Sequence, residues 1–265
     1  MPILNVDGCS IHYNVQGKGT PIVFIHPPLL TSINFLYQME DLSQHYQVIT
    51  FDIRGHGKSQ YSQRPITYKL IAEDLKQLLD HLEIKKAFIC GYSTGGSITL
   101  EFLLTFPDRA LGGIIISGMP YVNDDNLRKK ISLGVKLANA GAKKVLTWAI
   151  SFGNADRIKI FKKMVAEARL GDIRNIEQYY RYSLQYNCTD QLNRINHPIL
   201  LVFGKKDKSF HQYAMLLSEK LPNNELKFTN TSHQIPTKAA NELNEMIKQF
   251  CNDQNRKNNV DTYLI

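Results

Sequence analysis

The stretch Gly91-Tyr92-Ser93-Thr94-Gly95-Gly96 decides the fold. It follows a continuous apolar run, residues 87–90, and precedes a helical pattern over residues 98–106 that ends at a proline. A serine on so tight a turn between a strand and a helix has the setting of a nucleophile elbow. Its hydroxyl stands above the sheet, its backbone is strained, and the positions two residues away on either side need glycine. The stretch therefore predicts that Ser93 is a nucleophile.

Apolar runs of strand length alternate with helical patterns on both sides of this stretch. The predicted strands are residues 3–6, 10–15, 22–25, 48–51, 87–90, 111–116, 199–203 and 225–228. The first two form a hairpin that turns at Asp7-Gly8. Continuous apolar runs are typical of strands buried on both faces. The alternation predicts an α/β fold, with a mostly parallel sheet of about eight strands and helices on both faces.

One segment breaks the alternation, because no convincing strand lies between about Val122 and Cys188. Its apolar residues are spaced helically, so we expect residues 119–196 to form a helical lid inserted into a core of residues 1–118 and 197–251. The polar, asparagine-rich residues 252–265 are expected to form a disordered tail.

The predicted lid is basic and rich in aromatic residues. Residues 120–196 hold 14 Lys and Arg against 7 Asp and Glu, and therefore most of the net charge of +8. This charge either attracts an anionic substrate or surface, or solvates the helices, which is the interpretation we favour. The aromatic residues either line an apolar acyl pocket or pack the helices together; they are Trp148, Phe152, Phe161, Tyr179, Tyr180, Tyr182 and Tyr186.

Composition narrows the class of protein further. No window approaches the roughly 18 consecutive apolar residues of a membrane span, and the N-terminus lacks the pattern of a signal peptide. The four cysteines are scattered and form no CxxC pair, which favours buried free thiols over a metal site. We expect a cytoplasmic protein with no metal and no nucleic-acid partner.

A serine hydroxyl needs a base within hydrogen-bonding reach, and the base needs an orienting partner. In the order expected on such a fold, the acid and then the histidine follow the serine. Five of the eight histidines precede Ser93. His197 starts a strand at the wrong edge of the sheet, and His211 lies in a predicted helix. His233 follows the last strand in a polar loop, so we predict that it is the base.

Asp207 is the predicted carboxylate, because it comes just after the strand 199–203 at the edge where open α/β sheets gather their ligand-binding groups. Asp124 or Asp125, after the preceding strand, could supply the carboxylate instead. Position in the chain favours Asp207.

With these motifs the chain resembles the α/β-hydrolase superfamily over roughly residues 3–251. The resemblance rests on Gly91 to Gly96, Asp52-Ile53-Arg54-Gly55-His56-Gly57-Lys58-Ser59, Gly204-Lys205-Lys206-Asp207 and Ser232-His233. It implies an α/β-hydrolase fold with a lid and a serine hydrolase that acts on carboxylic esters through an acyl-enzyme. It implies no metal or organic cofactor. The loop from Asp52 to Ser59 is interpreted as structural.

One departure from the family pattern concerns the oxyanion hole. The family usually has His-Gly after the third strand, and the next residue donates an N–H to the oxyanion. Here the sequence is His26-Pro27-Pro28-Leu29, and proline has no backbone N–H. We expect Thr94 to supply one N–H and Leu29 to supply the second through a shifted loop. Loss of one such donor typically costs about 2.7–4 kcal/mol of transition-state stabilisation.

The sequence thus predicts an ester hydrolase with a small-molecule ester or acyl substrate. The prolines and the basic lid motivate an alternative, a ligand-binding signalling protein on a hydrolase scaffold with slow or no turnover and a protein partner. A perhydrolase or acyltransferase, in which another nucleophile replaces water, is a third reading.

Overall fold

An eight-stranded sheet forms the centre of the computed structural model, which describes the backbone of residues 2–262 and the side chains through residue 257. The strands are β1 (Ile3–Val6), β2 (Cys9–Gln16), β3 (Pro21–Ile25), β4 (Gln47–Phe51), β5 (Ala87–Tyr92), β6 (Ala110–Ile116), β7 (Ile199–Gly204) and β8 (Asn224–Thr229). Their order is β1-β2-β4-β3-β5-β6-β7-β8, and only the pairs β1–β2 and β2–β4 are antiparallel among the described strands. The predicted mostly parallel sheet is confirmed.

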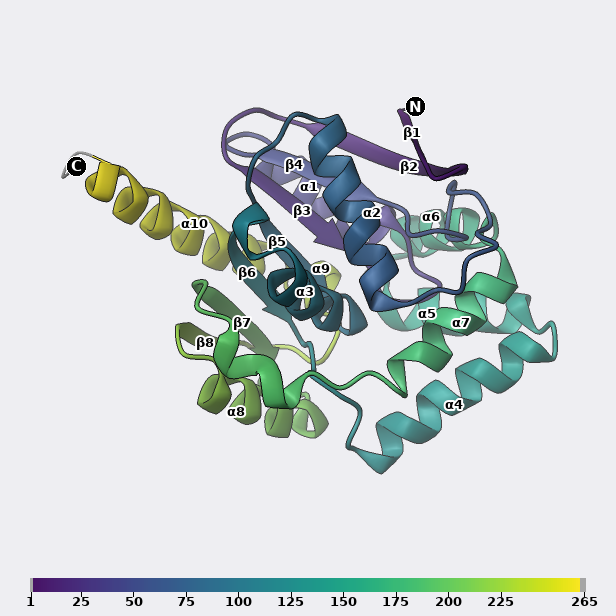
Figure 1. Cartoon of the computed structure of the whole chain (residues 1–265). Coiled ribbons are helices and arrows are strands. Elements are labelled where there is room, and N and C mark those ends of the chain that lie inside the picture. The colour runs from purple at the N-terminus through teal and green to yellow at the C-terminus, as the bar shows by residue number, and fades with distance from the viewer. Residues whose placement is uncertain (1, 263–265) are drawn as a thin grey trace.

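Helices cover both faces of this sheet (Figure 1). Buried side chains of α2, α3 and α8 pack on one face, and those of α1, α9 and α10 pack on the other. These helices are α1 (Leu36–Leu42), α2 (Tyr68–His81), α3 (Thr94–Thr105), α8 (His211–Lys220), α9 (Ile235–Lys238) and α10 (Ala240–Thr262). Short 3-10 turns are Ser32–Phe35, Pro107–Arg109, Thr189–Arg194 and Lys208–Phe210.

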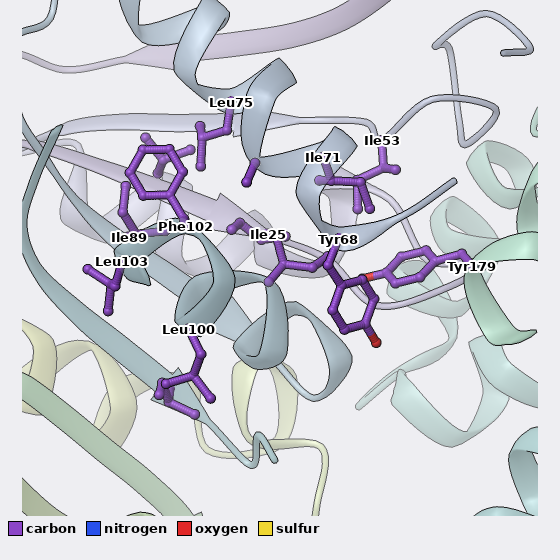
Figure 2. Packing of buried hydrophobic residues seen from close by; sticks show 14 of the residues in the cluster. Ile25, Ile53, Tyr68, Ile71, Leu75, Ile89, Leu100, Phe102, Leu103 and Tyr179 are labelled. Atoms are coloured by element: carbon purple, nitrogen blue, oxygen red, sulfur yellow. The ribbon is translucent and has the colours of Figure 1, made fainter. Parts of the chain in front are cut away.

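The larger apolar cluster lies under α2 and α3. Figure 2 shows Ile25 and Ile89 of the sheet facing Ile71 of α2 and Phe102 of α3, and all four side chains are fully buried. Close packing of this kind fixes the ends of β3 and β5 relative to α3. The loops that follow these two strands are therefore built on a rigid base.

Four helices lie between β6 and β7, and they are gathered at one side of the molecule (Figure 1). They are α4 (Asp125–Asn139), α5 (Lys143–Asn154), α6 (Ile158–Ala168) and α7 (Ile173–Ser183). In this segment, all of which the structure describes, the only strand-like pairing is one bridge between Tyr121 and Asn187. The division into core and lid, and the closing role that a lid implies, stay predictions.

The end of the chain differs from the sequence prediction. The sequence predicts a disordered tail over residues 252–265, whereas residues 252–262 continue α10 in the structure; the predicted disorder stays a prediction. Polar contacts hold the start of this extension: the Tyr46 hydroxyl donates to Asn252 at 2.8 Å, and the Asn255 amide donates to the Thr20 hydroxyl at 3.0 Å. Residues 263–265 lie outside the described residues.

The loop after β4 contains a network of hydrogen bonds centred on Asp52, whose side chain is fully buried. Asp52 accepts hydrogen bonds from the Ser32 N–H at 2.9 Å, the Lys58 N–H at 3.1 Å and the His12 ring at 3.1 Å. Burial alone would raise the pKa of the Asp52 carboxyl. The hydrogen bond from His12, the neighbouring His26 and the N–H groups of Ser32 and Lys58 together lower this pKa to about 2. The network ties the loop after β4 to the loop after β3, as the structural interpretation of residues 52–59 expects.

The turn from β5 to α3 carries Ser93 in a left-handed conformation, with φ of 55° and ψ of −121°. A side chain at Gly91 would overlap the backbone of Gly95, and a side chain at Gly95 would overlap the carbonyl of Ile25. Only glycine at these two positions lets β5, α3 and β3 approach so closely. The strained serine that the sequence predicts is therefore present.

Replacing Gly91 with alanine tests this packing. We expect Gly91→Ala to lower the free energy of unfolding by at least about 2 kcal/mol, because the added carbon has no space and the neighbouring backbone must move. Gly153→Ala is the matched control, since a carbon added there meets nothing within 4 Å, and a helical alanine stabilises by up to about 1 kcal/mol. Urea unfolding followed by circular dichroism measures both, and equal stabilities would contradict the account.

A second prediction concerns His56, which is fully buried in the loop after β4. Burial, reinforced by the neighbouring His26, lowers the pKa of His56 to about 3. In the unfolded chain the imidazole takes up a proton near pH 6.5, whereas in the folded protein it stays neutral down to about pH 3. Its contribution to stability is therefore complete above pH 6.5 and is lost as the pH falls from 6.5 towards 3.

Between pH 7 and pH 5 we expect the wild-type protein to lose roughly 2 kcal/mol of unfolding free energy through His56, at about 1.4 kcal/mol per pH unit below 6.5. His56→Gln removes the titrating group, so the pH dependence should be shallower by that amount. Urea unfolding of both proteins at the two pH values measures the difference. Parallel pH profiles would show that His56 is not buried as a neutral group.

Candidate active site

Three side chains that are distant in the sequence meet at the carboxyl edge of the sheet. The Ser93 hydroxyl lies 3.0 Å from Nε2 of His233, and Nδ1 of His233 lies 2.8 Å from Oδ2 of Asp207. In the matching tautomer Nδ1–H donates to the carboxylate and Nε2 accepts from the serine hydroxyl. These two hydrogen bonds form a continuous relay from a hydroxyl to a carboxylate. With this geometry His233 can accept the proton of Ser93 as the serine attacks.

The two loops that bring Asp207 and His233 together are joined through Gly204 at the end of β7. A side chain at Gly204 would overlap the carbonyls of Thr231 and Ser232. The N–H of Lys206 donates to Thr231 at 3.0 Å, so the loop after β7 runs against the loop after β8. Because β7 and β8 are parallel neighbours, both loops leave the sheet at the same edge.

The ring of His233 has two aromatic neighbours. Its centroid lies 4.3 Å from that of Phe210 and 5.4 Å from that of Tyr92. Ser209 donates to Oδ1 of Asp207 at 3.1 Å, which leaves Oδ2 for the histidine. Burial, with the nearby Asp207, raises the pKa of Tyr92, so its hydroxyl stays protonated and donates to Asn154 at 3.0 Å. These contacts fix the orientation of the imidazole.

The other candidates considered from sequence lie apart from Ser93. Asp124 caps α4 by accepting from the Leu127 N–H at 2.7 Å, and Asp125 is exposed in the first turn of that helix. His197 bonds the carbonyl of Pro107, and His211 lies 3.2 Å from the Gly204 carbonyl. The structure therefore brings Ser93, His233 and Asp207 together and leaves these four residues outside the relay.

The loop after β3 forms part of the wall of the cavity that also contains His233. Pro27 and Pro28 line the cavity beside Ser93, whereas Leu29 is 1% exposed and adopts a left-handed conformation with φ of 70°. Thr94 is the first residue of α3, where backbone N–H groups have no partner within the helix. The positive end of the α3 dipole also points to this place. Thr94 and Leu29 stay predictions as oxyanion donors.

A tyrosine of α7 anchors this loop. The Tyr179 hydroxyl donates to the carbonyl of His26 at 3.0 Å and accepts from the Thr94 hydroxyl at 3.4 Å. His26 in turn lies 2.9 Å from the Pro27 carbonyl through Nδ1, and its Nε2 accepts from the Ile53 N–H at 2.9 Å. The helices between β6 and β7 are thus bonded directly to the loop that faces Ser93.

A cavity of about 280 Å³ opens above the relay. Most of its wall is apolar, formed by Leu30, Met119, Leu127, Ile131, Ile150 and Phe210. Larger and more open hollows lie elsewhere on the surface, and one of about 690 Å³ borders Tyr37 and Asn230, but it contains none of the three relay residues. The chemistry therefore belongs to the smaller cavity.

Sequence reasoning missed several residues of this cavity. Lys130 and Asn154 reach it from α4 and α5, and Tyr180 reaches it from α7. Burial raises the pKa of Tyr180, so its hydroxyl is a proton donor and not a base at neutral pH. Tyr180 is one of the seven aromatic residues that the sequence offered as lining of an acyl pocket, whereas two others, Trp148 and Phe152, are exposed. No periodic pattern in the sequence separates buried from exposed residues among them, because the packing of the helices determines which side chains reach the cavity.

Two further properties bear on what the site can bind. Across residues 2–262 no helix combines the length and the apolar character that a membrane span requires. Among the side chains of residues 2–257, no group of three or more His, Cys, Asp or Glu is placed to hold a metal ion. All four cysteines are buried free thiols.

Comparison with known proteins agrees with this architecture. A family model described as the alpha/beta hydrolase fold matches residues 20–135. The AB hydrolase superfamily protein YisY of Bacillus subtilis is 26% identical over an alignment of 261 positions. The alignment covers 89% of this chain and 93% of the relative. The enol-lactonase from Burkholderia xenovorans has a TM-score of 0.85 at 18% identity, with 95% and 100% of the two chains covered.

A third comparison gives the same fold. The esterase EaEST from Exiguobacterium antarcticum has a TM-score of 0.84 at 19% identity, over 94% of this chain and 97% of that one. Together with the mostly parallel eight-stranded sheet and the serine turn after β5, these matches show that the chain has the α/β-hydrolase fold and is similar to proteins of the α/β-hydrolase superfamily along most of its length.

Proposed function

We propose that this protein is a serine hydrolase that cleaves small carboxylic esters through an acyl-enzyme. The observation that carries the proposal is the unbroken hydrogen-bonded relay, with 3.0 Å between Ser93 and His233 and 2.8 Å between His233 and Asp207. The structurally similar proteins include an esterase and an enol-lactonase, both of which are named for cleaving an ester bond. A cavity of about 280 Å³ favours a small substrate or a short acyl group.

In the first half of the proposed reaction, Ser93 Oγ attacks the carbonyl carbon of the ester. His233 Nε2 takes the hydroxyl proton, and Asp207 stabilises the imidazolium and keeps the ring in the required tautomer. The carbonyl oxygen becomes an oxyanion, to which Thr94 donates its backbone N–H at the start of α3. As the tetrahedral intermediate collapses, the C–O bond breaks and His233 returns the proton to the leaving alkoxide.

In the second half, water attacks the acyl-enzyme. His233 accepts a proton from the water, a second tetrahedral oxyanion forms, and the bond to Ser93 breaks as the proton returns to Oγ. The products are a carboxylic acid and an alcohol. The reaction as written balances without a metal or an organic cofactor. The cytoplasmic location predicted from sequence stays a prediction.

The second oxyanion donor decides how fast this reaction runs. The backbone between His26 and Leu29 offers no N–H at Pro27 or Pro28, and we assign the second donor to Leu29. Its positive φ supports the assignment, because strained backbone of this kind costs on the order of 1–3 kcal/mol and clusters at functional sites. Without a second donor, slow turnover would favour the alternative, a ligand-binding protein on a hydrolase scaffold.

Ser93→Ala tests the nucleophile. A fluorophosphonate probe should label the wild-type protein, and labelling should be absent in the variant because its methyl group cannot attack phosphorus. Hydrolysis of p-nitrophenyl acetate, followed over many turnovers, should fall at least about 10³-fold. Ser218→Ala on α8 is the matched control and should keep both activities. Probe labelling that survives in Ser93→Ala would reject the assignment, and a single burst without turnover would favour the ligand-binding alternative.

Asp207→Asn tests the choice of carboxylate. An asparagine in this place holds the imidazole in the wrong tautomer, so we expect kcat to fall by about 10³–10⁴-fold. Asp125→Asn, a change of the same size at the exposed start of α4, should leave kcat within about twofold of the wild type because exposed substitutions away from a site are near neutral. Steady-state kinetics with a short p-nitrophenyl ester measure both. A large loss in Asp125→Asn with little loss in Asp207→Asn would reverse the assignment.

A further inference from the structure

Helix α5 presents its side chains in an unusual arrangement. Val145, Trp148 and Phe152 form one stripe and are 57%, 56% and 72% exposed. The opposite face buries Thr147 and Ser151, whose hydroxyls have no hydrogen-bond partner among the described residues. A surface helix usually turns its apolar residues inward and its polar residues outward. The outer face of α5 is therefore not explained by packing of the fold.

The neighbouring helix extends this apolar surface. Ile158, at the start of α6, is 67% exposed. Phe161 of α6 lies beneath the two aromatic side chains of α5, with ring centroids 4.9 Å from Trp148 and 6.2 Å from Phe152. We call Val145, Trp148, Phe152 and Ile158 the apolar patch. Contiguous exposed apolar surface of this kind marks an interaction site more often than isolated residues do.

Basic side chains border the apolar patch. Lys144 on α5 and Lys159 and Lys162 on α6 are exposed, and none of them forms an ion pair with a side chain that the structure describes. Residues 143–168 contain six Lys and Arg against two acidic residues. Both acids are already engaged: Asp156 accepts from the Tyr37 hydroxyl at 2.8 Å, and Glu167 pairs with Lys58 at 3.1 Å.

We propose that the outer face of α5 and α6 docks on an anionic lipid bilayer. Apolar and aromatic side chains bordered by lysines are the composition of helices that lie in a membrane interface. Each lysine near such a surface contributes about 1 kcal/mol of attraction, and tryptophan is favoured at the boundary between lipid and water. A protein partner fits less well, because lysine is depleted at protein interfaces, and a second copy of this chain would bring like charges together.

The patch lies close to the candidate site, because α5 belongs to both. Its inner side contributes Ile150 and Asn154 to the cavity above Ser93, while its outer side carries Trp148 and Phe152. One helix thus separates the membrane-docking face from the cavity. Docking on lipid uses no residue of the relay, so it goes beyond the proposed function and its test can fail or succeed independently of ester hydrolysis.

Trp148 makes the experiment direct, because it is the only tryptophan of the chain. The full-length wild-type protein is mixed with phosphatidylcholine vesicles, either pure or containing phosphatidylglycerol, and tryptophan emission is recorded. We expect a shift of the emission to shorter wavelength with anionic vesicles, co-sedimentation with them, and quenching by brominated acyl chains. High salt should weaken the binding.

Two pairs of substitutions separate the two components of the surface. Phe152→Ser with Ile158→Ser should weaken binding to anionic vesicles at least tenfold. In the variant, two apolar side chains that the lipid would bury have been replaced by small polar ones, so the free energy of their transfer from water to lipid is lost. Lys159→Gln with Lys162→Gln should weaken it roughly fivefold for each lysine. Both pairs keep Trp148 as the reporter and lie at exposed positions, so thermal unfolding should be unchanged.

Leu133→Ser and Met215→Ser are the matched controls, because these residues are 55% and 62% exposed but lie outside the patch. They should bind vesicles as the wild type does. An unchanged wild-type emission spectrum with anionic vesicles, or equal loss in the controls, overturns the proposal. An emission shift that depends only on protein concentration, with a dimer in size-exclusion chromatography, assigns the patch instead to self-association and also overturns it.

Discussion

The close approach of three backbones at the turn after β5 is the constraint on which the rest of the site depends. Gly91 and Gly95 leave no room for a side chain, and the turn between them holds Ser93 in a left-handed conformation with φ of 55°. That conformation raises the hydroxyl above the sheet and aims the start of α3 at the same space. Asp207 and His233 then need only reach this one point. They do so because β7 and β8 are parallel neighbours whose loops touch at Gly204.

Much of this arrangement could be predicted from the sequence, because the signals are local. Gly91 and Gly95 flank the serine at fixed spacing, apolar runs mark the strands, and the order of Ser93, Asp207 and His233 in the chain selects one acid and one base from many. Strand direction then places all three at a single edge of the sheet. The predicted strands match the observed ones to within one or two residues, since buried strands end where apolar runs end.

Other features depend on tertiary contacts that no local pattern encodes. The path of the loop after β3 follows from bonds to Tyr179 and Ile53, so the left-handed Leu29 could not be foreseen from its proline neighbours. Residues 252–262 read as a polar tail, yet they extend α10, and Asn255 is bonded to Thr20 across the fold. Helix α5 exposes an apolar stripe and buries the hydroxyl side chains of Thr147 and Ser151, so periodicity alone could not tell which face is exposed.

The covalent intermediate offers the most direct measurement of the central claim. The wild-type protein is mixed with p-nitrophenyl acetate, quenched in acid at short times and digested, and the peptides are examined by mass spectrometry. The account predicts one acetyl group on the peptide that contains Ser93, formed before the first turnover ends and lost as the ester is consumed. Many turnovers of the ester with no adduct on Ser93, or with the acyl group on another residue, would contradict it.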